Sequence, residues 1–544
     1  MILNNKLIYN LTLGLGFLFF ILSFISTINY PPWHQFIANF SIYLSIICFS
    51  FVILLQNKGI RIHYLSCLFL IISFIPIIQY LLGYIFFFST AFLSFSYLLI
   101  FFVSSVLFSN LFRKNERYIL NIFILVILFI TWFQIFLSYI QWLNIDLNNS
   151  FFLENKTKRV FGNLGQPNNL ASLLLISLVV LMYWFENKKI GIRLFYFNSL
   201  NIVFCLILTQ SRTGALGFLV IMLFLALLRA KFYLVNLKII TILTTFFILF
   251  NLFFIKLQDF IASWIGIDLL KGGGVLERNL ATDTRFEIWH FFIKVIAEKP
   301  WFGYGWYQTQ ISQYYNFSDL NGRFVSAHNI FLDIFIWNGV LIGFLIIFAL
   351  AFLLILILTK IKDNKDYLIF LVFLILLNHS LFEFPLFYPY FIFIFSIFLG
   401  YFFNKINFKY LSINRYIYAL VFFAQAFFMY VIWSDYIEYQ DKKIFASNAG
   451  MGFVEPYSVN VKILDVLEQD LILLSINKFD RLSEKEVAEI EKLVAHNMSF
   501  YNLLKFCQIL QNNMMDEKLE QTIHKLKILY NYDVDKAQLM SLQF

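Results

Sequence analysis

The stretch FVSAHNIFLDIFIWNG, from Phe324 to Gly339, combines an apolar segment with polar side chains at its start. His328 and Asn329 open the segment, and Asp333 follows a little over one helical turn later. The apolar run continues to residue 359, which is longer than the ~20 residues that a helix needs to cross a bilayer. Because polar groups are costly near hydrocarbon, the stretch predicts a membrane helix whose polar entrance has a function.

The composition extends this interpretation to the whole chain of 544 residues. Hydrophobic residues make up 60% of it and charged residues only 13%, whereas soluble domains carry about a quarter charged residues. The net charge of +9 is spread over short basic segments between apolar runs. This distribution is typical of membrane topology signals and argues against a nucleic-acid partner. We therefore predict an all-α polytopic membrane protein.

The length rule predicts about 13 membrane spans. Their ranges are 7–30, 37–56, 64–82, 85–112, 118–141, 169–185, 194–210, 214–230, 239–256, 328–359, 367–384, 388–403 and 416–434. With the N-terminus in the cytoplasm, most basic loops fall on the cytoplasmic side, as the positive-inside rule requires. An odd number of spans then places the C-terminus outside. Three outer segments carry positive charge against the rule, namely 142–168, 211–214 and 257–327.

Residues 435–544 are polar, unlike the membrane portion 1–434. The segments SEKEVAEIEKLVAHNM (483–498) and MDEKLEQTIHKLKILYNY (515–532) repeat apolar residues at spacings of three and four, which predicts helices. Ser483 opens the first of them with the spacing of a capping box. We predict that 435–544 is a small α-helical domain on the outer face of the membrane.

The segment KRVFGNLGQPNNLASLL (158–174) places Gln166, Pro167, Asn168 and Asn169 where an outer loop enters a membrane helix. In a structural interpretation, an asparagine caps the helix and the proline sets its direction. That interpretation assigns no role to Gln166 or to the two glycines before it. A functional interpretation of the tetrapeptide stays open beside the structural one.

The segment LTQSRTGALG (208–217) places Arg212 at a tight reversal between two spans. A lone arginine at the interface most often extends to the phospholipid headgroups. The neighbouring Gln210, Ser211 and Thr213 are all hydrogen-bond donors ahead of a helix N-terminus. The alternative is therefore a pyrophosphate site formed by backbone N–H groups and a guanidinium.

The long outer loop 257–327 contains a segment, 283–298, that predicts an amphipathic helix lying on the membrane surface. Its apolar side is formed by Phe286, Trp289, Ile293 and Ile296. Arg285 lies near the border of that side, where it would be held over the bilayer surface.

Two further pairs of polar residues stand at the outer ends of spans. His328 either caps the tenth span or acts in catalysis, and Asn329 and Asp333 have the i, i+4 spacing at which side chains hold each other. His379 and Glu383 repeat this spacing, and a carboxylate there can fix the tautomer of the histidine. No third ligand is evident in the sequence, and the four cysteines have no metal-binding or disulfide spacing, so we predict no metal site.

In this order, the segments resemble the O-antigen ligase/polymerase-like membrane glycosyltransferases. The matching pieces are FGNLGQPNNLA (161–171), TQSRTGALG (209–217), DTRFEIWHFFIKVIAEKPWFGYGW (283–306), SAHNIFLDIFIWNGVLIG (326–343) and NHSLFEFPLFY (378–388). The Gln-Pro-Asn element and the outer C-terminal segment are most similar to the bacterial protein O-oligosaccharyltransferases, the PglL and pilin-glycosylating ligase group. Many members carry a tyrosine where this chain has Phe384, so the role of that phenol is lost here or falls to Tyr388.

The resemblance implies a GT-C-type glycosyltransferase of the bacterial inner membrane, in contact with membrane lipids and with a periplasmic active site and C-terminal domain. The implied reaction transfers a preassembled oligosaccharide from an undecaprenyl-pyrophosphate-linked donor to Ser or Thr of a periplasmic acceptor protein such as a type IV pilin, without a cofactor. His328 would be the general base, and Arg212 and Arg285 would bind the pyrophosphate. Donor and acceptor binding would fall to Gln166, Asn168, Asn169, Asn329, His379, Glu383 and Tyr388.

Two other functions stay open. Ligation of O-antigen to lipid A-core, or polymerisation of O-antigen, uses nearly the same machinery and differs in its acceptor. A transporter of lipid-linked oligosaccharides belongs to a different class. Against a transporter, the polar candidates gather at one face of the predicted membrane domain instead of near its midplane, and no inverted repeat is evident.

Overall fold

The computed structural model describes residues 2–27, 33, 35–56, 59–146, 152–153, 155, 159–266, 269–270, 284–317, 320–406, 408–452 and 461–542. Residues 28–30 of the first predicted span, Lys158, and 271–283 of the predicted outer loop lie outside this part of the chain. The chain divides into two compact units. The first comprises Met1–Phe69, Ile100–Asp283 and Ala351–Phe422, and the second comprises Leu70–Leu99, Thr284–Leu350 and Phe423–Phe544.

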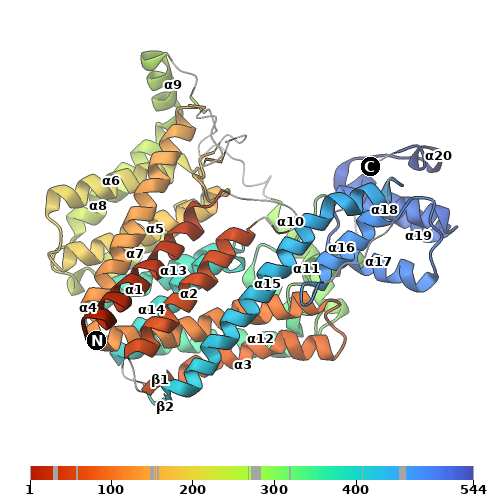
Figure 1. Cartoon of the computed structure of the whole chain (residues 1–544). Helices are drawn as coiled ribbons and strands as arrows, with labels where there is room; N and C mark the ends of the chain where they lie inside the picture. The colour runs from red at the N-terminus through yellow and green to blue at the C-terminus, as the bar shows by residue number, and fades with distance from the viewer. Residues whose placement is uncertain are drawn as a thin grey trace. The chain divides into compact units, whose positions relative to one another are not determined.

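The described residues are mostly helical (Figure 1). The α-helices are α1 (Ile2–Ile25), α2 (Phe36–Gln56), α3 (Cys67–Leu81), α4 (Phe88–Trp142), α5 (Pro167–Glu186), α6 (Ile192–Leu208), α7 (Arg212–Leu227), α8 (Leu237–Leu252), α9 (Phe254–Ile265), α10 (Arg285–Glu298), α11 (Thr309–Tyr315), α12 (Ile330–Lys360), α13 (Asp366–Ser380), α14 (Pro389–Ile406), α15 (Arg415–Gly450), α16 (Asp465–Ser475), α17 (Glu484–His496), α18 (Phe500–Asn512), α19 (Asp516–Tyr530) and α20 (Lys536–Leu539). Short 3-10 helices are η1 (Tyr64–Ser66), η2 (Arg229–Lys231) and η5 (Pro385–Phe387). Helices satisfy their own backbone hydrogen bonds, as a membrane requires.

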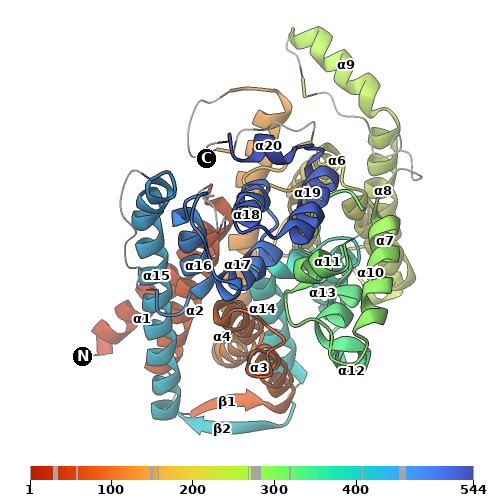
Figure 2. The same ribbon diagram turned by 90° about the vertical axis from the view of Figure 1, so that its right-hand side faces the viewer.

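One small sheet interrupts the helical fold of the first unit. Strands β1 (Gly59–His63) and β2 (Tyr410–Asn414) pair antiparallel, with Gly59 opposite Asn414 and His63 opposite Tyr410. Figure 1 and Figure 2 show the two strands side by side. The sheet therefore joins two of the basic loops that were predicted to be cytoplasmic.

The predicted spans fall on helices. The fourth and fifth, 85–112 and 118–141, both lie in α4, which is interrupted at Asn115 (φ −154°, ψ 71°). Eight helices of the described residues are long and apolar enough to cross a membrane, or up to nine if α8 and α9, bent by 71°, form one span. Three further helices, α6, α7 and α13, are apolar but shorter. The all-α multi-pass membrane protein is therefore confirmed, and the count of about 13 spans stays a prediction.

Helix α5 lies at the centre of the first unit and packs against α6, α7 and α13. Nearly all its residues are buried, as expected of an apolar helix that is surrounded on all sides. Two glycines of α7 allow close approach: a Cβ atom on Gly214 would lie 2.6 Å from the Cβ of Ala171, and one on Gly217 would lie 2.9 Å from Leu175 Cδ1. Small residues at such contacts are typical of membrane helix packing.

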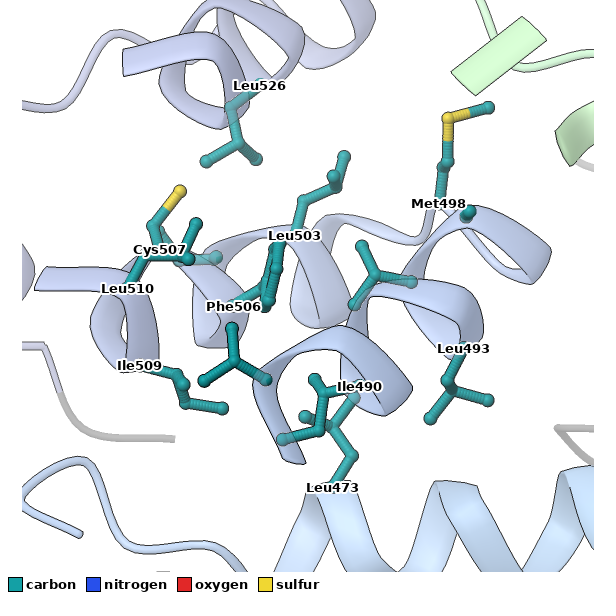
Figure 3. Packing of buried hydrophobic residues seen from close by; sticks show 14 of the residues in the cluster. Leu473, Ile490, Leu493, Met498, Leu503, Phe506, Cys507, Ile509, Leu510 and Leu526 are labelled. Atoms are coloured by element: carbon teal, nitrogen blue, oxygen red, sulfur yellow. The ribbon is translucent and has the colours of Figure 1, made fainter. Parts of the chain in front are cut away.

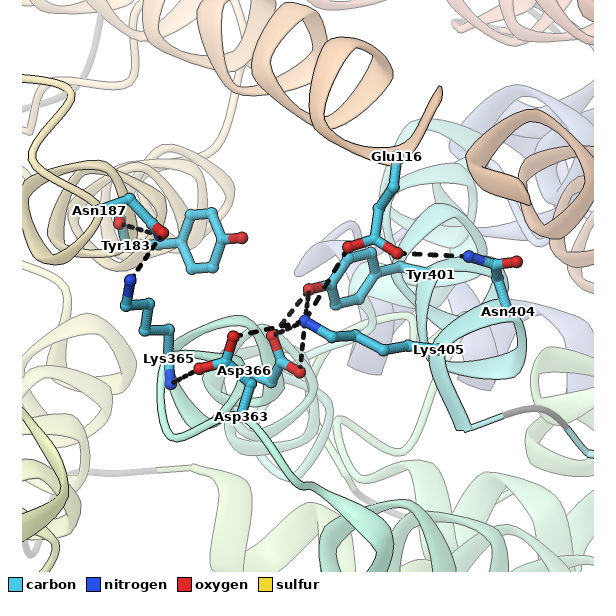
Figure 4. Close-up of polar contacts among 9 residues, drawn as sticks. All are labelled: Glu116, Tyr183, Asn187, Asp363, Lys365, Asp366, Tyr401, Asn404 and Lys405. Carbon is cyan, nitrogen blue, oxygen red and sulfur yellow. Dashed lines mark hydrogen bonds and ion pairs between the residues drawn. The ribbon is translucent and has the colours of Figure 1, made fainter. Parts of the chain in front are cut away.

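A charged cluster joins α13 to α14 at the end of α13 opposite His379 (Figure 4). Lys405 Nζ lies 2.9 Å from the carboxylate of Asp366, which is the first residue of α13, and donates a hydrogen bond to Tyr401 Oη at 2.9 Å. Tyr401 in turn donates to Asp366 at 2.7 Å. Asp366 is buried and Lys405 is partly exposed, so the additional hydrogen bonds help to offset the desolvation of the carboxylate.

In the second unit, α12 is interrupted where the turn after α10 packs against it. Gly339 has φ 72° and ψ 174°, and the break frees backbone groups that the turn satisfies. Tyr304 N–H donates to Ile336 C=O at 2.8 Å, and Val340 N–H donates to Pro300 C=O at 2.7 Å. The segment of α12 before the break, which carries Asp333, is therefore held by the turn PWFGYG (300–305).

The C-terminal helices of the second unit enclose an apolar core. Figure 2 shows α16, α17, α18 and α19 next to one another, and Figure 3 shows the buried side chains between them, among them Leu473, Ile490, Leu503 and Leu526. The helices predicted at 483–498 and 515–532 are confirmed as α17 and α19. Ser483 and Glu486 form the predicted capping box. The domain boundary at residue 435 stays a prediction, and α15 continues across it.

Candidate functional site

The entrance of α5 forms a hydrogen-bonded cluster around Glu383 in the first unit. Asn168 Nδ2 donates to one carboxylate oxygen of Glu383 at 2.8 Å, and Gln166 Nε2 donates to the other at 3.2 Å. Gln166 is the N-cap residue of α5 but makes no side-chain cap, and Pro167 is the first helical residue. The capping role considered for Asn168 and Asn169 is therefore wrong, because both asparagines lie inside the first turn and face neighbouring helices.

Asn168 also connects α5 to the turn that carries Arg212. Ser211 Oγ donates to Asn168 Oδ1 at 2.6 Å and accepts from Gly214 N–H at 2.8 Å, so Ser211 caps α7. Arg212 is the first residue of α7 and is half-buried. The predicted position of Arg212 at a helix N-terminus is thus confirmed. The positive end of the helix dipole and the guanidinium together favour an anion at this turn.

Arg159 is a second arginine of this cluster that the sequence did not single out. Its Nε donates to the carbonyl oxygen of Thr209 at 3.0 Å, and its Nη2 lies 3.4 Å from Asn168 Oδ1. Arg159 precedes the matching motif by only two residues, in a loop that carries positive charge against the topology rule. That charge bias is the signal in the sequence that could have identified it.

Two glutamines of α4 hold the loop that precedes Gln166. Gln141 Oε1 accepts from the backbone N–H groups of Phe161 and Gly162 at 3.0 and 2.9 Å, and Gln134 Oε1 accepts from Asn163 N–H at 2.8 Å. Gly162 has φ 58°, and a Cβ atom there would clash with Gln134 Oε1. The glycine is therefore required by the close approach of the loop to α4.

His379 lies at the end of α13, and its Nδ1 is 2.7 Å from Ser172 Oγ of α5. The side chain is fully buried. Ser172 lies one turn after Asn168 on α5, so the same face of α5 contacts both Glu383 and His379. The contact of Ser172 with His379 was not evident from the sequence, because serine is common in membrane helices.

Aromatic side chains continue the cluster toward α14. Asn169 Nδ2 donates to Tyr390 Oη at 3.4 Å. The ring of Tyr388 is stacked between those of Tyr390 and Phe384, with centroid distances of 5.4 and 6.2 Å. Tyr388 and Phe384 thus lie in direct ring contact, which suits the hypothesis that Tyr388 carries the phenol at this place.

In the second unit, the start of α12 carries His328 and Asn329. Asn329 Oδ1 accepts from the N–H groups of Phe331 and Leu332 at 3.0 and 3.4 Å, so Asn329 caps the helix. The capping role considered for His328 is therefore wrong. His328 is partly exposed and has φ 53°, a left-handed conformation that is uncommon for a residue with a side chain.

Asp333 holds the turn before His328. Its fully buried carboxylate accepts from Ser326 Oγ at 2.5 Å, Ala327 N–H at 2.9 Å and Thr309 Oγ1 at 2.9 Å. Ser326 Oγ in turn accepts from His328 N–H at 3.0 Å. The predicted side-chain pairing of Asp333 with Asn329 is wrong, because the carboxylate reaches back to the turn while the amide caps the helix. Asp333 still acts on His328, through Ser326.

Arg285 is the first residue of α10, and the predicted helix 283–298 is confirmed except that its residue 283 lies outside the described part. Ile288, Phe292 and Val295 are buried, whereas Phe286 and Ile293 are exposed. The helix thus has a packed apolar face and an exposed one, and the exposed face is the one predicted to lie on the membrane. Arg285 itself is partly buried.

Each unit brings some of the predicted residues together. The first unit joins Gln166, Asn168 and Glu383 by direct hydrogen bonds and places Arg212 beside them through Ser211. Arg285, His328 and Asn329 belong to the second unit. Within the residues that the structure describes, no three His, Cys, Asp or Glu side chains gather as a metal ion would require. The side chains described above are imidazoles, guanidinium groups, amides, hydroxyls and carboxylates.

Comparison with known proteins gives the same family as the motifs. A family described as "O-Antigen ligase" matches residues 197–348, and one described as "Protein glycosylation ligase" matches residues 160–185. A protein of Acinetobacter baylyi named General O-oligosaccharyltransferase is 27% identical over an alignment of 529 residues that covers 94% of this chain and 91% of the relative. Another protein of that organism, named ComP-specific O-oligosaccharyltransferase, is 28% identical over an alignment of 498 residues that covers 87% of this chain and 86% of the relative. The resemblance predicted from the motifs is confirmed.

Proposed function

Since the chain is a glycosyltransferase, we propose that it transfers a preassembled oligosaccharide from an undecaprenyl-pyrophosphate-linked donor to Ser or Thr of a periplasmic acceptor protein such as a type IV pilin. The named activity of both relatives supports transfer of an oligosaccharide to an oxygen atom. The protein would reside in the inner membrane, with its N-terminus in the cytoplasm. The residues 435–544 and the site would face the periplasm.

His328 would be the general base. A Ser or Thr hydroxyl is a weak nucleophile, so a base must take its proton as the oxygen attacks the anomeric carbon. The φ of 53° at His328 supports this role, because backbone strain of this kind costs on the order of 1–3 kcal/mol and persists where the surroundings enforce it. The turn is enforced by Ser326 and Asp333.

Arg212 and Arg285 would bind the pyrophosphate. The leaving group carries negative charge that grows as the glycosidic bond breaks, and charge-assisted hydrogen bonds from guanidinium groups stabilise it. Two arginines would thus take the place of a metal ion. The position of Arg212 at the capped N-terminus of α7 supports its part in this scheme.

The observation that carries the proposal is the hydrogen-bonded cluster of Gln166, Asn168, Glu383 and Ser211 next to Arg212. Such a fixed set of amide and carboxylate groups beside a cation suits a ligand with many hydroxyl groups and a phosphate end. Donor or acceptor binding would also involve the other predicted residues, namely Asn169, Asn329, His379 and Tyr388. The buried His379 would act through its contact with Ser172.

Ligation of O-antigen to lipid A-core and polymerisation of O-antigen are less well supported, because both relatives over nearly the full chain are named O-oligosaccharyltransferases. A transporter of lipid-linked oligosaccharides has no comparable support. A reaction in detergent separates a transferase from a transporter, since transport cannot occur without a membrane barrier.

The test uses the purified full chain in detergent with a lipid-pyrophosphate-linked oligosaccharide and a periplasmic pilin-like protein. Transfer to Ser or Thr is measured by mass spectrometry of the acceptor. We expect His328→Ala to fold normally and to lose transfer by ~100-fold or more, the usual contribution of general base catalysis. His290→Ala, an exposed histidine of the same unit, serves as the matched control. Unchanged transfer by His328→Ala would remove His328 from the mechanism.

The arginine variants test donor binding in the same assay. Arg212→Lys and Arg285→Lys should raise the KM for the donor, because lysine keeps the charge but loses the two-pronged geometry of the guanidinium. The exposed Arg229→Lys is the control. Lysine variants with unchanged donor KM and kcat would contradict the proposed contact with pyrophosphate.

A further inference from the structure

Helix α11 is a short, largely polar helix inside the second unit. The residues Thr309, Gln310, Ser312 and Gln313 are buried in spite of their polarity. Burial of such groups is costly unless they are hydrogen-bonded, and Thr309 and Gln313 have partners outside the helix. These partners lie at the start of α12 and in the chain before it, and other residues of α11 pack on the C-terminal helices.

On one side, α11 holds the segment that leads to His328. Thr309 Oγ1 donates to Asp333 at 2.9 Å, and the indole N–H of Trp337 donates to Thr309 Oγ1 at 2.8 Å. The side-chain amide of Gln313 binds the backbone of the segment before His328. Its Nε2 donates to the carbonyl oxygen of Gly322 at 2.9 Å, and its Oε1 accepts from Phe324 N–H at 3.0 Å. The chain from 322 to 328 is thus attached to α11 at its beginning and to Asp333 at its end.

On the other side, α11 packs on the C-terminal helices. Ile311 and Tyr314 belong to the same apolar core as Val487 and Ile490 of α17. The hydroxyl of Tyr314 donates to Glu491 at 3.3 Å. Helix α11 therefore packs against α17.

Helix α19 contacts the same tyrosine of α11. Lys525 Nζ lies 3.9 Å from the centre of the Tyr314 ring, and the lysine is itself buried. A cation over an aromatic ring is most favourable where water is excluded. The chain after α11 is held as well, because Arg323 donates to Asn497 Oδ1 at 3.0 Å just beyond the end of α17.

We infer that α17 and α19 are positioning elements for His328, acting through α11 and the segment 322–328. The inference rests on the proposed function, in which His328 is the base. If the helices hold the base in place, loosening their contact with α11 lowers kcat for every acceptor. A docking surface alone would change only the KM of acceptors that touch it.

The test compares Tyr314→Leu and Gln313→Leu with the unmodified full chain. Tyr314→Leu keeps an apolar side chain in the core but loses the contacts with Glu491 and Lys525, and Gln313→Leu releases the segment 322–324. Each is assayed with a folded acceptor protein and with a short serine-containing peptide. We expect kcat to fall by ~10-fold or more on both acceptors, since small displacements of a reacting group have effects of this size. The KM for each acceptor should change by less than ~2-fold.

Four further variants separate positioning from general damage. Glu491→Gln keeps an acceptor oxygen for Tyr314 and should retain most activity, whereas Glu491→Leu should lower kcat as Tyr314→Leu does. The double variant Tyr314→Leu/Gln313→Leu should be little worse than the poorer single variant, because both act on one segment. Lys492→Ala, which removes an exposed ion pair of α17 with Glu489, is the matched control and should be neutral.

Hydrogen exchange supplies a readout apart from activity. The amide of Phe324 should exchange faster in Tyr314→Leu, while the amides inside α18 stay protected. Unchanged kcat in both Tyr314→Leu and Gln313→Leu, or a rise in KM confined to the folded acceptor, would overturn the inference. Absence of transfer by the unmodified chain would instead refute the proposed function, and the inference with it.

Discussion

Replacing Asp333 by alanine should release the turn that carries His328. The carboxylate is fully buried and accepts three hydrogen bonds, two of them from Ser326 and Ala327 in that turn. Alanine at this position removes the acceptor and leaves the buried Ala327 N–H without the carboxylate oxygen to which it donates. The hydroxyl of Ser326 can rotate toward another acceptor, but the backbone N–H cannot.

The size of the effect follows from these contacts. A hydrogen bond to a charged group contributes about 1.5–3 kcal/mol, and a buried donor left without an acceptor costs about 1–3 kcal/mol. Removal of a buried charge also relieves its desolvation, which offsets part of the loss. We therefore expect the turn at 326–328 to be destabilised by about 2 kcal/mol, which raises the population of its open form up to about 30-fold.

The assay pairs hydrogen exchange with transfer kinetics. In Asp333→Ala, the amide of Ala327 should exchange faster and kcat should fall, with the KM for donor little changed. Asp333→Asn keeps one oxygen and the shape of the side chain, so its exchange rate and its kcat should lie between those of the wild type and those of Asp333→Ala. Asp533→Ala removes an exposed carboxylate with an exposed lysine partner and serves as the control. Wild-type exchange at Ala327 together with wild-type kcat in Asp333→Ala would refute the reasoning.

Gly339→Ala should lower the thermal midpoint of the detergent-solubilised protein by several degrees, because φ 72° with ψ 174° is open almost only to glycine and costs other residues about 1–3 kcal/mol. Gly191→Ala, with no atom near the new Cβ, should be neutral, and equal midpoints for the two variants would contradict the argument. Glu383→Gln should raise the KM for the donor, because the new NH₂ group faces one of the two amide NH₂ groups, of Gln166 and Asn168, that donate to the carboxylate. A KM equal to that of the wild type would show that this cluster does not bind the donor. Burial lowers the pKa of Lys505 from 10.5 to about 8, so between these pH values the unfolded chain binds a proton that the folded chain does not, and stability rises with pH. Lys505→Met should remove this rise, which is checked by thermal midpoints of both proteins at pH 7, 8, 9 and 10; parallel pH profiles would exclude Lys505 as its source.

The chain's membrane character and most of its helices are determined by the sequence itself. The apolar runs are long, and a bilayer leaves the backbone no hydrogen-bond partner outside the chain, so each run has to be helical. The capping box at Ser483 and the two helices at 483–498 and 515–532 were predictable for a similar reason, since caps and amphipathic spacing act over three or four residues. The family resemblance likewise depends on local motifs.

The partners of the polar side chains were decided by the tertiary structure. Gln166 and Glu383 are separated by 217 positions, so their contact exists only because α5 packs beside the end of α13. Local spacing had suggested that Asp333 pairs with Asn329, but the buried carboxylate takes the three donors that folding brings to it. A buried polar group must be satisfied by whatever the packing of distant segments provides, and no short-range pattern in the sequence records which segments those are.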